Sequence, residues 1–175
     1  MSEYNLDTEN INEWVKDLKA GDIVNLSGCI YTARDAAHKR IFQALDEGNE
    51  LPFKIENSVV YYAGPTPAKN NLTIGSVGPT TSSRMDAYSP RLLALGQKAM
   101  IGKGNRNPEV VEAIKNNGAV YFAAIGGAGA LYSDCVKECK VIAFEDLGCE
   151  SVKKLRVEKF SLIVAIDSEG NSLYK

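Results

Sequence analysis

The chain has 175 residues, of which 45% are hydrophobic and 24% are charged, and its formal net charge is −2. That length suffices for one domain with a substantial core, and the composition is ordinary for a soluble globular protein. The near balance of 20 basic and 22 acidic residues argues against a nucleic-acid-binding domain, and the lack of a long apolar run or a signal peptide argues against a membrane or secreted protein, so we expect a cytoplasmic location.

The first half of the chain predicts alternating helices and strands. Four apolar residues within 8–18 fall on one face at helical spacing, and Asp7 or Thr8 can cap that helix. The other expected elements are a strand over 23–32, a helix over 36–45, and short strands over 59–62 and 72–74 on either side of a turn-rich stretch at 64–67.

The second half alternates more regularly. Pro108 suits the start of a helix that ends at Gly118. The expected elements are helices over 83–95 and 108–117 and from about 127, with strands over 99–101, 119–125, 141–144 and 155–166 and a turn at 170–171. This alternation predicts an α/β fold with several strand-to-helix turns on one side, in a single domain over 1–175. It does not establish the strand order.

The segment 76–86, SVGPTTSSRMD, is the most informative in the chain. A Gly-Pro turn leads into hydroxyl residues, any of which from Thr80 to Ser83 could cap a following helix. A helix N-terminus suits an anion, and the Arg84 guanidinium matches a carboxylate. This segment alone does not decide against the alternative interpretation, in which Thr80 only caps a helix and Arg84 is an ordinary surface residue.

Two further turns carry cations. Arg34 stands at a strand-to-helix junction with His38 four residues later, although Asp35 could instead be a cap and His38 solvated. Lys103 lies between two glycines at a strand end, where the backbone can approach a ligand closely, but the spacing is not that of a P-loop.

Turns at the same ends of strands can converge on one cleft. Arg34, Arg84 and Lys103, together with threonine hydroxyls, would suit a ligand that bears two carboxylates. The glycine-rich stretch 125–131 lacks the spacing of a dinucleotide-binding turn, so we expect close packing of a helix on the sheet or a second anion-binding turn there.

The four cysteines do not show the spacing of a structural zinc site, and the single histidine does not complete one. Cys135 and Cys139 are four residues apart and could share a helical face. We expect all four to be reduced thiols and no metal ligand in this chain. The cysteines are Cys29, Cys135, Cys139 and Cys149.

Four motifs give the chain a specific family resemblance. They are ARDAAHKR at 33–40, GPTTSSRMD at 78–86, KGNR at 103–106 and IGGA at 125–128. In this order they resemble the motifs of the C-terminal domain of iron–sulfur-dependent class I fumarases, which is a separate β subunit in two-subunit versions. The likeness covers about 23–174. The L-tartrate dehydratase β subunit is a near neighbour, but the motifs look more like the fumarase branch.

This resemblance implies a hydro-lyase that reversibly adds water to fumarate to give S-malate. It implies a [4Fe–4S] cluster held by three cysteines of a partner α subunit, and the cysteines here do not match those ligand positions. Thr80 looks like the catalytic base, activated by an aspartate of the α subunit. Arg34, Arg84 and Lys103 look like contacts to the substrate carboxylates and hydroxyl, and His38 either joins them or supports Arg34.

The resemblance also implies the fold and the assembly. The fold is a swivelling β/β/α domain, with a mixed sheet or small barrel flanked by helices. We expect a homodimer alone, an α2β2 complex with the partner, and activity only in that complex. The alternatives are a tartrate dehydratase subunit and a stand-alone dicarboxylate-binding domain without activity.

Overall fold

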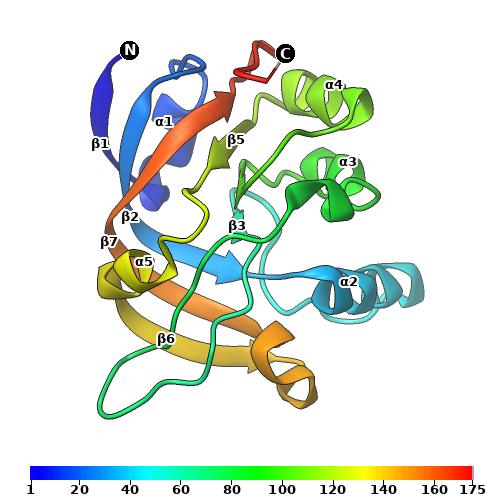
Figure 1. The fold of residues 1–175 in the computed structure, drawn as a ribbon. Coiled ribbons are helices and arrows are strands. Elements are labelled where there is room, and N and C mark those ends of the chain that lie inside the picture. The colour runs from blue at the N-terminus through cyan, green and yellow to red at the C-terminus, as the bar shows by residue number, and fades with distance from the viewer. Residues whose placement is uncertain (175) are drawn as a thin grey trace.

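The computed structural model describes residues 1–174 and contains a mixed β-sheet that closes into a five-stranded barrel (Figure 1). β2 to β5 run parallel, and β7 closes the barrel because it pairs antiparallel with both β5 and β2. The predicted α/β class, with a small barrel flanked by helices, is confirmed. The barrel strands are β2 (Ile23–Thr32), β3 (Val59–Tyr61), β4 (Ala99–Gly102), β5 (Val120–Ala123) and β7 (Val152–Ile166).

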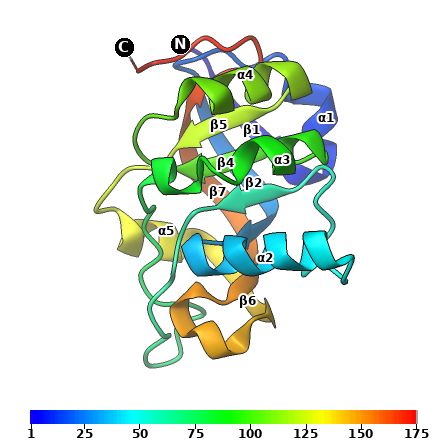
Figure 2. The ribbon, with the colours of Figure 1, turned by 90° about the vertical axis from the view of Figure 1, so that its right-hand side faces the viewer.

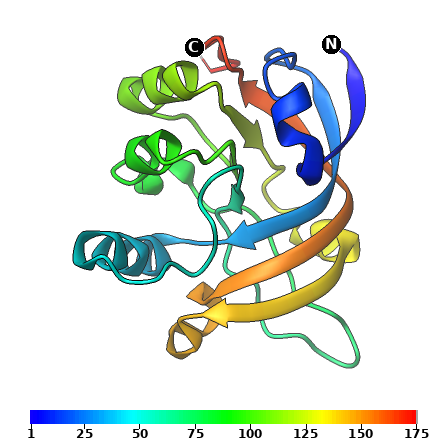
Figure 3. The ribbon, with the colours of Figure 1, turned by 180° about the vertical axis from the view of Figure 1, so that it is seen from behind.

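Two further strands extend the sheet beyond the barrel. β1 (Glu3–Asp7) pairs parallel with β2, and β6 (Val136–Ala143) pairs antiparallel with β7. Figure 3 shows the long β7 curving past β2 from its start beside β6 to the upper end of the barrel. β7 is 15 residues long, so its first half can pair with β6 and its second half with β5 while both halves contact β2.

Side chains alternate between two apolar clusters on the two sides of the barrel wall. Tyr61 and Phe122 belong to the inner cluster, whereas the adjacent Tyr62 and Tyr121 belong to the outer one. This follows from the period of two along a strand. The short helices α1 (Ile11–Trp14) and α5 (Gly129–Cys135) add side chains to the inner cluster.

Three helices cover the outer cluster: α2 (Asp35–Glu47), α3 (Ser89–Ala94) and α4 (Pro108–Asn117). They lie side by side over the strands in Figure 2. The predicted helix over 108–117 is confirmed with its local signals, since the Asn107 side chain caps it and Gly118 ends it at a φ of 57°. Local chemistry therefore sets where this helix starts and stops.

Several predicted elements are wrong. Residues 72–74 form no strand, because the apolar Ile74 is instead buried in the inner cluster from a loop. The expected helix over 83–95 is divided into a 3₁₀ turn, η2 (Ser82–Met85), and α3, which has Pro90 in its first turn. The expected helix over 8–18 is a short 3₁₀ turn, η1 (Thr8–Asn10), followed by α1.

The C-terminal half also differs from the prediction around the cysteines. Cys135 ends α5 and Cys139 lies in β6, so the two do not share a helical face. β6 is an edge strand that overlaps the predicted strand over 141–144 but begins earlier, at Val136, where exposed residues hide the apolar alternation. All four cysteines are free, and in residues 1–174 no helix is long and apolar enough to cross a membrane.

Candidate active site

The segments that carry the predicted site residues lie together at the carboxyl ends of the parallel strands. Arg34 follows β2, the segment of Thr80 and Arg84 comes after β3, and Lys103 follows β4. The Thr80 amide donates to the carbonyl of Tyr62 at 2.7 Å, and the Lys103 amide donates to the carbonyl of Thr80 at 3.3 Å. These backbone bonds, with a parallel bridge between Thr81 and Lys103, fix the two segments side by side.

The side chains of Thr80 and Arg84 are in direct contact. Arg84 Nη2 donates to Thr80 Oγ1 at 2.6 Å and lies 3.1 Å from Asp35 Oδ2. Thr80 caps no helix, because the residue that directly precedes η2 is Thr81. The Thr81 side chain also makes no capping hydrogen bond. The Thr80 oxygen is thus held by a guanidinium rather than by a helix N-terminus.

Arg34 lies beside the chain that leaves β3. A Cβ at Gly64 would come within 2.6 Å of Arg34 Nη1, so only a glycine leaves room for the guanidinium there. Arg34 Nε is 3.8 Å from Glu150 Oε1, and this buried nitrogen has no hydrogen-bond partner within residues 1–174. A buried N–H without a partner is costly, whereas the accessible remainder of the Arg34 side chain, which is 28% exposed, can meet an external carboxylate.

His38 lies beneath Arg34 and away from the surface. Its ring is 1% exposed and stacks on Tyr88, with 5.4 Å between ring centroids. Nδ1 lies 2.9 Å from the Arg34 carbonyl oxygen. Burial lowers the pKa of His38 to about 4, and the Arg106 charge acts in the same direction. The alternative of a solvated His38 behind an Asp35 cap is therefore wrong, and His38 is a neutral support for the Arg34 turn.

Lys103 is exposed, and its alkyl chain lies against the turn that follows β5. A Cβ at Gly126 would be 3.7 Å from Lys103 Cδ, an ordinary contact. Within the described part of the chain, Lys103 Nζ makes neither a hydrogen bond nor an ion pair. Its ammonium can therefore contact a ligand at the same edge as Thr80.

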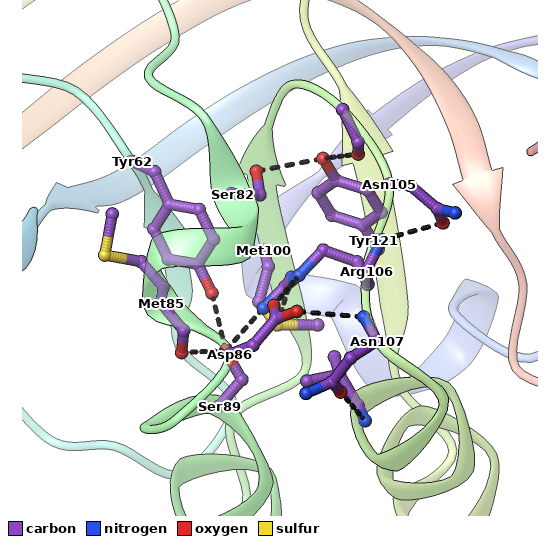
Figure 4. A network of polar contacts seen from close by, with 12 residues as sticks. Tyr62, Ser82, Met85, Asp86, Ser89, Met100, Asn105, Arg106, Asn107 and Tyr121 are labelled. Carbon is purple, nitrogen blue, oxygen red and sulfur yellow. Dashed lines mark hydrogen bonds and ion pairs between the residues drawn. The ribbon is translucent and has the colours of Figure 1, made fainter.

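A buried polar network joins the Thr80 and Lys103 segments from below (Figure 4). Arg106, with a fully buried side chain, donates from Nε to Asp86 Oδ1 at 2.6 Å and from Nη2 to Ser89 Oγ at 2.6 Å. Asp86 Oδ2 accepts from the Asn107 amide at 2.8 Å. The guanidinium also lies between two rings, 5.4 Å from Tyr62 and 5.0 Å from Tyr121.

No role for this network is predicted from the sequence. Its signal was present, because Asp86 and Arg106 are opposite charges that end two of the four motifs. Tyr121 continues the network, since its hydroxyl lies 2.9 Å from Ser82 Oγ and 2.8 Å from the Gly104 carbonyl oxygen. The network thus holds both loops of the site against the outer face of the barrel.

The donor set of the site does not fit an iron–sulfur cluster. In residues 1–174, no three His, Cys, Asp or Glu side chains come together as a metal site requires. The cysteines lie on separate elements: β2, α5, β6 and η3 (Glu145–Glu150). The site instead offers two guanidinium groups, an ammonium and a hydroxyl, which suit a ligand with two carboxylates.

Comparisons with known proteins give a family model and several relatives for this chain. A family model described as fumarase C-terminus matches residues 1–175. "Putative L(+)-tartrate dehydratase subunit beta" of Methanocaldococcus jannaschii is 44% identical over 167 residues, which cover 92% of this chain and 86% of the relative. Fumarate hydratase 2 of Leishmania major is 36% identical over 168 residues, or 95% of this chain and 30% of the relative.

A bacterial relative gives the same relation in length. The aerobic class I fumarate hydratase of Escherichia coli is 36% identical over 154 residues, or 87% of this chain and 28% of the relative. The chain thus spans most of the archaeal relative but only about a third of the fumarate hydratases.

Proposed function

Because the chain belongs to the fumarase C-terminus family, we propose that it is the β subunit of a two-subunit class I fumarate hydratase. Together with an α subunit that carries a [4Fe–4S] cluster, it hydrates fumarate reversibly to S-malate in the cytoplasm. The whole chain, 1–175, is one domain of that enzyme, a homodimer alone and part of an α2β2 complex. The observation that carries the proposal is the Thr80 hydroxyl held by Arg84 at an edge lined by cations.

The lengths of the relatives support a two-chain enzyme. Fumarate hydratases of which this chain covers 28–30% contain a further part, whereas the relative named a β subunit is covered over 86% of its length. The cysteines of this chain do not form a cluster site, so we assign the cluster to the α subunit.

The cations of this chain bind and orient the dicarboxylate. The Arg34 side chain is 28% exposed, and the exposed Lys103, whose Nζ has no partner within residues 1–174, is free to contact a carboxylate or hydroxyl oxygen. Arg84 uses Nη2 for Thr80 and Asp35, and its Nε and Nη1 remain for the substrate. Fixed cations also stabilise the negative charge that develops when the proton leaves the carbon beside a carboxylate.

Thr80 exchanges that proton through Oγ1. A threonine hydroxyl is a weak base and needs a partner that removes its own proton, a role that we assign to an aspartate of the α subunit. The hydrogen bond from the positively charged Arg84 stabilises negative charge on Oγ1. The cluster, when bound by the α subunit, supplies a Lewis acid for the hydroxyl that leaves or arrives.

L-tartrate dehydration is the second candidate reaction. The 44% identity to the archaeal relative, whose name includes tartrate dehydratase, favours it over other dicarboxylate reactions. The same cations and Thr80 would act on either substrate, so assays of the complex with fumarate, S-malate and L-tartrate decide between them. A complex inactive on all three would leave a dicarboxylate-binding domain.

Substitution of Thr80 tests the proposed role directly. In the purified α–β complex, Thr80→Ala should lower turnover roughly 100-fold or more, as expected for loss of a general base. Its melting temperature should stay close to that of the wild type, because Thr80 caps no helix. Thr80→Ser keeps a hydroxyl and should retain much of the activity.

Thr81→Ala is the matched control. Thr81 is the adjacent exposed hydroxyl and makes no capping bond, so its loss should leave turnover unchanged. Normal turnover in Thr80→Ala, or loss of turnover in Thr81→Ala alone, would contradict the assignment of Thr80.

A further inference from the structure

We propose that Asp35 is a positioning residue of this site, which holds the Arg84 guanidinium on the Thr80 hydroxyl. The inference rests on the proposed function and goes beyond it, because Asp35 contacts neither the substrate nor the reacting atoms. It acts through Arg84, whose Nη2 lies 3.1 Å from Asp35 Oδ2 and 2.6 Å from Thr80 Oγ1.

The two contacts meet at one nitrogen of Arg84. Nη2 donates a hydrogen bond to Thr80 Oγ1 and forms an ion pair with Asp35 Oδ2. The Arg84 side chain is 46% exposed, so it would sample several rotamers if only the hydroxyl held it. The carboxylate of Asp35 therefore selects the rotamer in which Arg84 reaches Thr80.

Asp35 is not occupied by the end of its own helix. It is the first residue of α2, where a carboxylate commonly bonds to a free backbone amide. The residue before α2, Arg34, makes no capping bond, and the Ala36 amide instead donates to Glu150 Oε1 at 3.3 Å. Within residues 1–174 the Asp35 carboxylate accepts no hydrogen bond from a backbone amide, so it is available to Arg84 across the gap between α2 and η2.

A negative charge at this point has a cost for substrate binding. Asp35 is close to the guanidinium that contacts a dicarboxylate, and like charges repel at this distance. A positioning role therefore predicts a specific kinetic pattern: removal of Asp35 lowers kcat, because Thr80 loses its alignment, while KM stays the same or falls. If Asp35 only competed with the substrate for Arg84, its removal would lower KM without loss of kcat. If Asp35 were a plain surface residue, its removal would change neither constant.

The first test measures kinetics of the α–β complex. Asp35→Ala should lower kcat at least tenfold without an increase in KM, and Asp35→Asn, which keeps an oxygen acceptor, should lose less. Asp46→Ala is the matched control, since Asp46 lies on the same helix and pairs with Arg91 at 2.6 Å. It should leave both constants unchanged. An active wild-type complex with an unchanged kcat in Asp35→Ala would overturn the inference but not the proposed function.

The second test needs no activity. In the β chain alone, ¹⁵N NMR of the arginine side chains should show slow rotation about the Nε–Cζ bond of Arg84, assigned by its disappearance in Arg84→Lys. Asp35→Ala should speed this rotation to that of a free arginine, and Asp46→Ala should not. Fast rotation of Arg84 in the wild type would refute the positioning role whatever the complex catalyses.

Discussion

Substitution of Asp86 by Asn should destabilise the chain strongly, because it leaves the Arg106 charge buried without its counter-ion. The Arg106 side chain is 0% exposed and that of Asp86 is 9% exposed. Removal of one partner of such a pair costs about 3–5 kcal/mol of unfolding free energy. With an m-value of about 2 kcal/mol per molar urea, the urea midpoint should fall by roughly 1.5–2.5 M.

Urea unfolding followed by circular dichroism is the measurement, and two further variants serve as controls. Asp46→Ala removes an exposed partner of Arg91 and should lose at most about 1 kcal/mol. The double variant Asp86→Leu with Arg106→Met removes both charges, so it should lose less than Asp86→Asn alone. A loss in Asp86→Asn no larger than that of Asp46→Ala would refute the reasoning that Arg106 is an obligate buried cation.

Three further predictions concern His38, Arg84 and iron. The pKa of His38 falls from 6.5 to about 4 on folding, so between these pH values the unfolded chain binds a proton that the folded chain does not. The unfolding free energy therefore has its highest value, as far as His38 is concerned, above pH 6.5, and it declines by about 3 kcal/mol as the pH falls from 6.5 to 4. His38 is the single histidine, so its NMR ring signals report this directly, and a midpoint near 6.5 would contradict it. Arg84→Lys should lower kcat/KM of the complex at least tenfold, since an ammonium cannot reproduce the planar donors, and near wild-type kinetics would remove Arg84 from the site. The β chain reconstituted anaerobically alone should contain no stoichiometric iron and sulfide by elemental analysis, because residues 1–174 gather no cluster ligands; a brown, iron-loaded chain would count against the assignment of the cluster to the partner.

Elements with strong local signals could be predicted from the sequence. α4 begins at Pro108 after the Asn107 cap, and Gly118 ends it with a positive φ, as Gly48 ends α2. β1 was not predicted and β6 was predicted only at its end, over 141–143, because edge strands with many exposed side chains lack a clear apolar period. The barrel closure was also beyond a local pattern, since it depends on one strand, β7, that pairs on both of its edges.

The site divides in the same way. Cations in turns after successive strands, Arg34, Arg84 and Lys103, are visible in a sequence because parallel strands bring their carboxyl ends to one edge. Which carboxylate each cation meets is a matter of side-chain geometry between elements far apart in the chain. Asp35 is 49 positions from Arg84 in the sequence, and no local pattern relates the two.

The two aspartate–arginine pairs of this edge differ in burial, and this difference matches what each must do. Asp86 and Arg106 are buried and fully bonded, so they hold two loops in one relative position at all times. Asp35 and Arg84 are 43% and 46% exposed, so their pair is weaker than a buried one and leaves part of the guanidinium open to a substrate carboxylate. A site that binds a dianion needs both: a rigid base that sets Thr80 against Lys103, and a surface cation whose charge is not already neutralised by a strong buried partner. A buried Arg84 would no longer be a surface cation open to the substrate, and an exposed Arg106 would no longer hold the two loops rigidly.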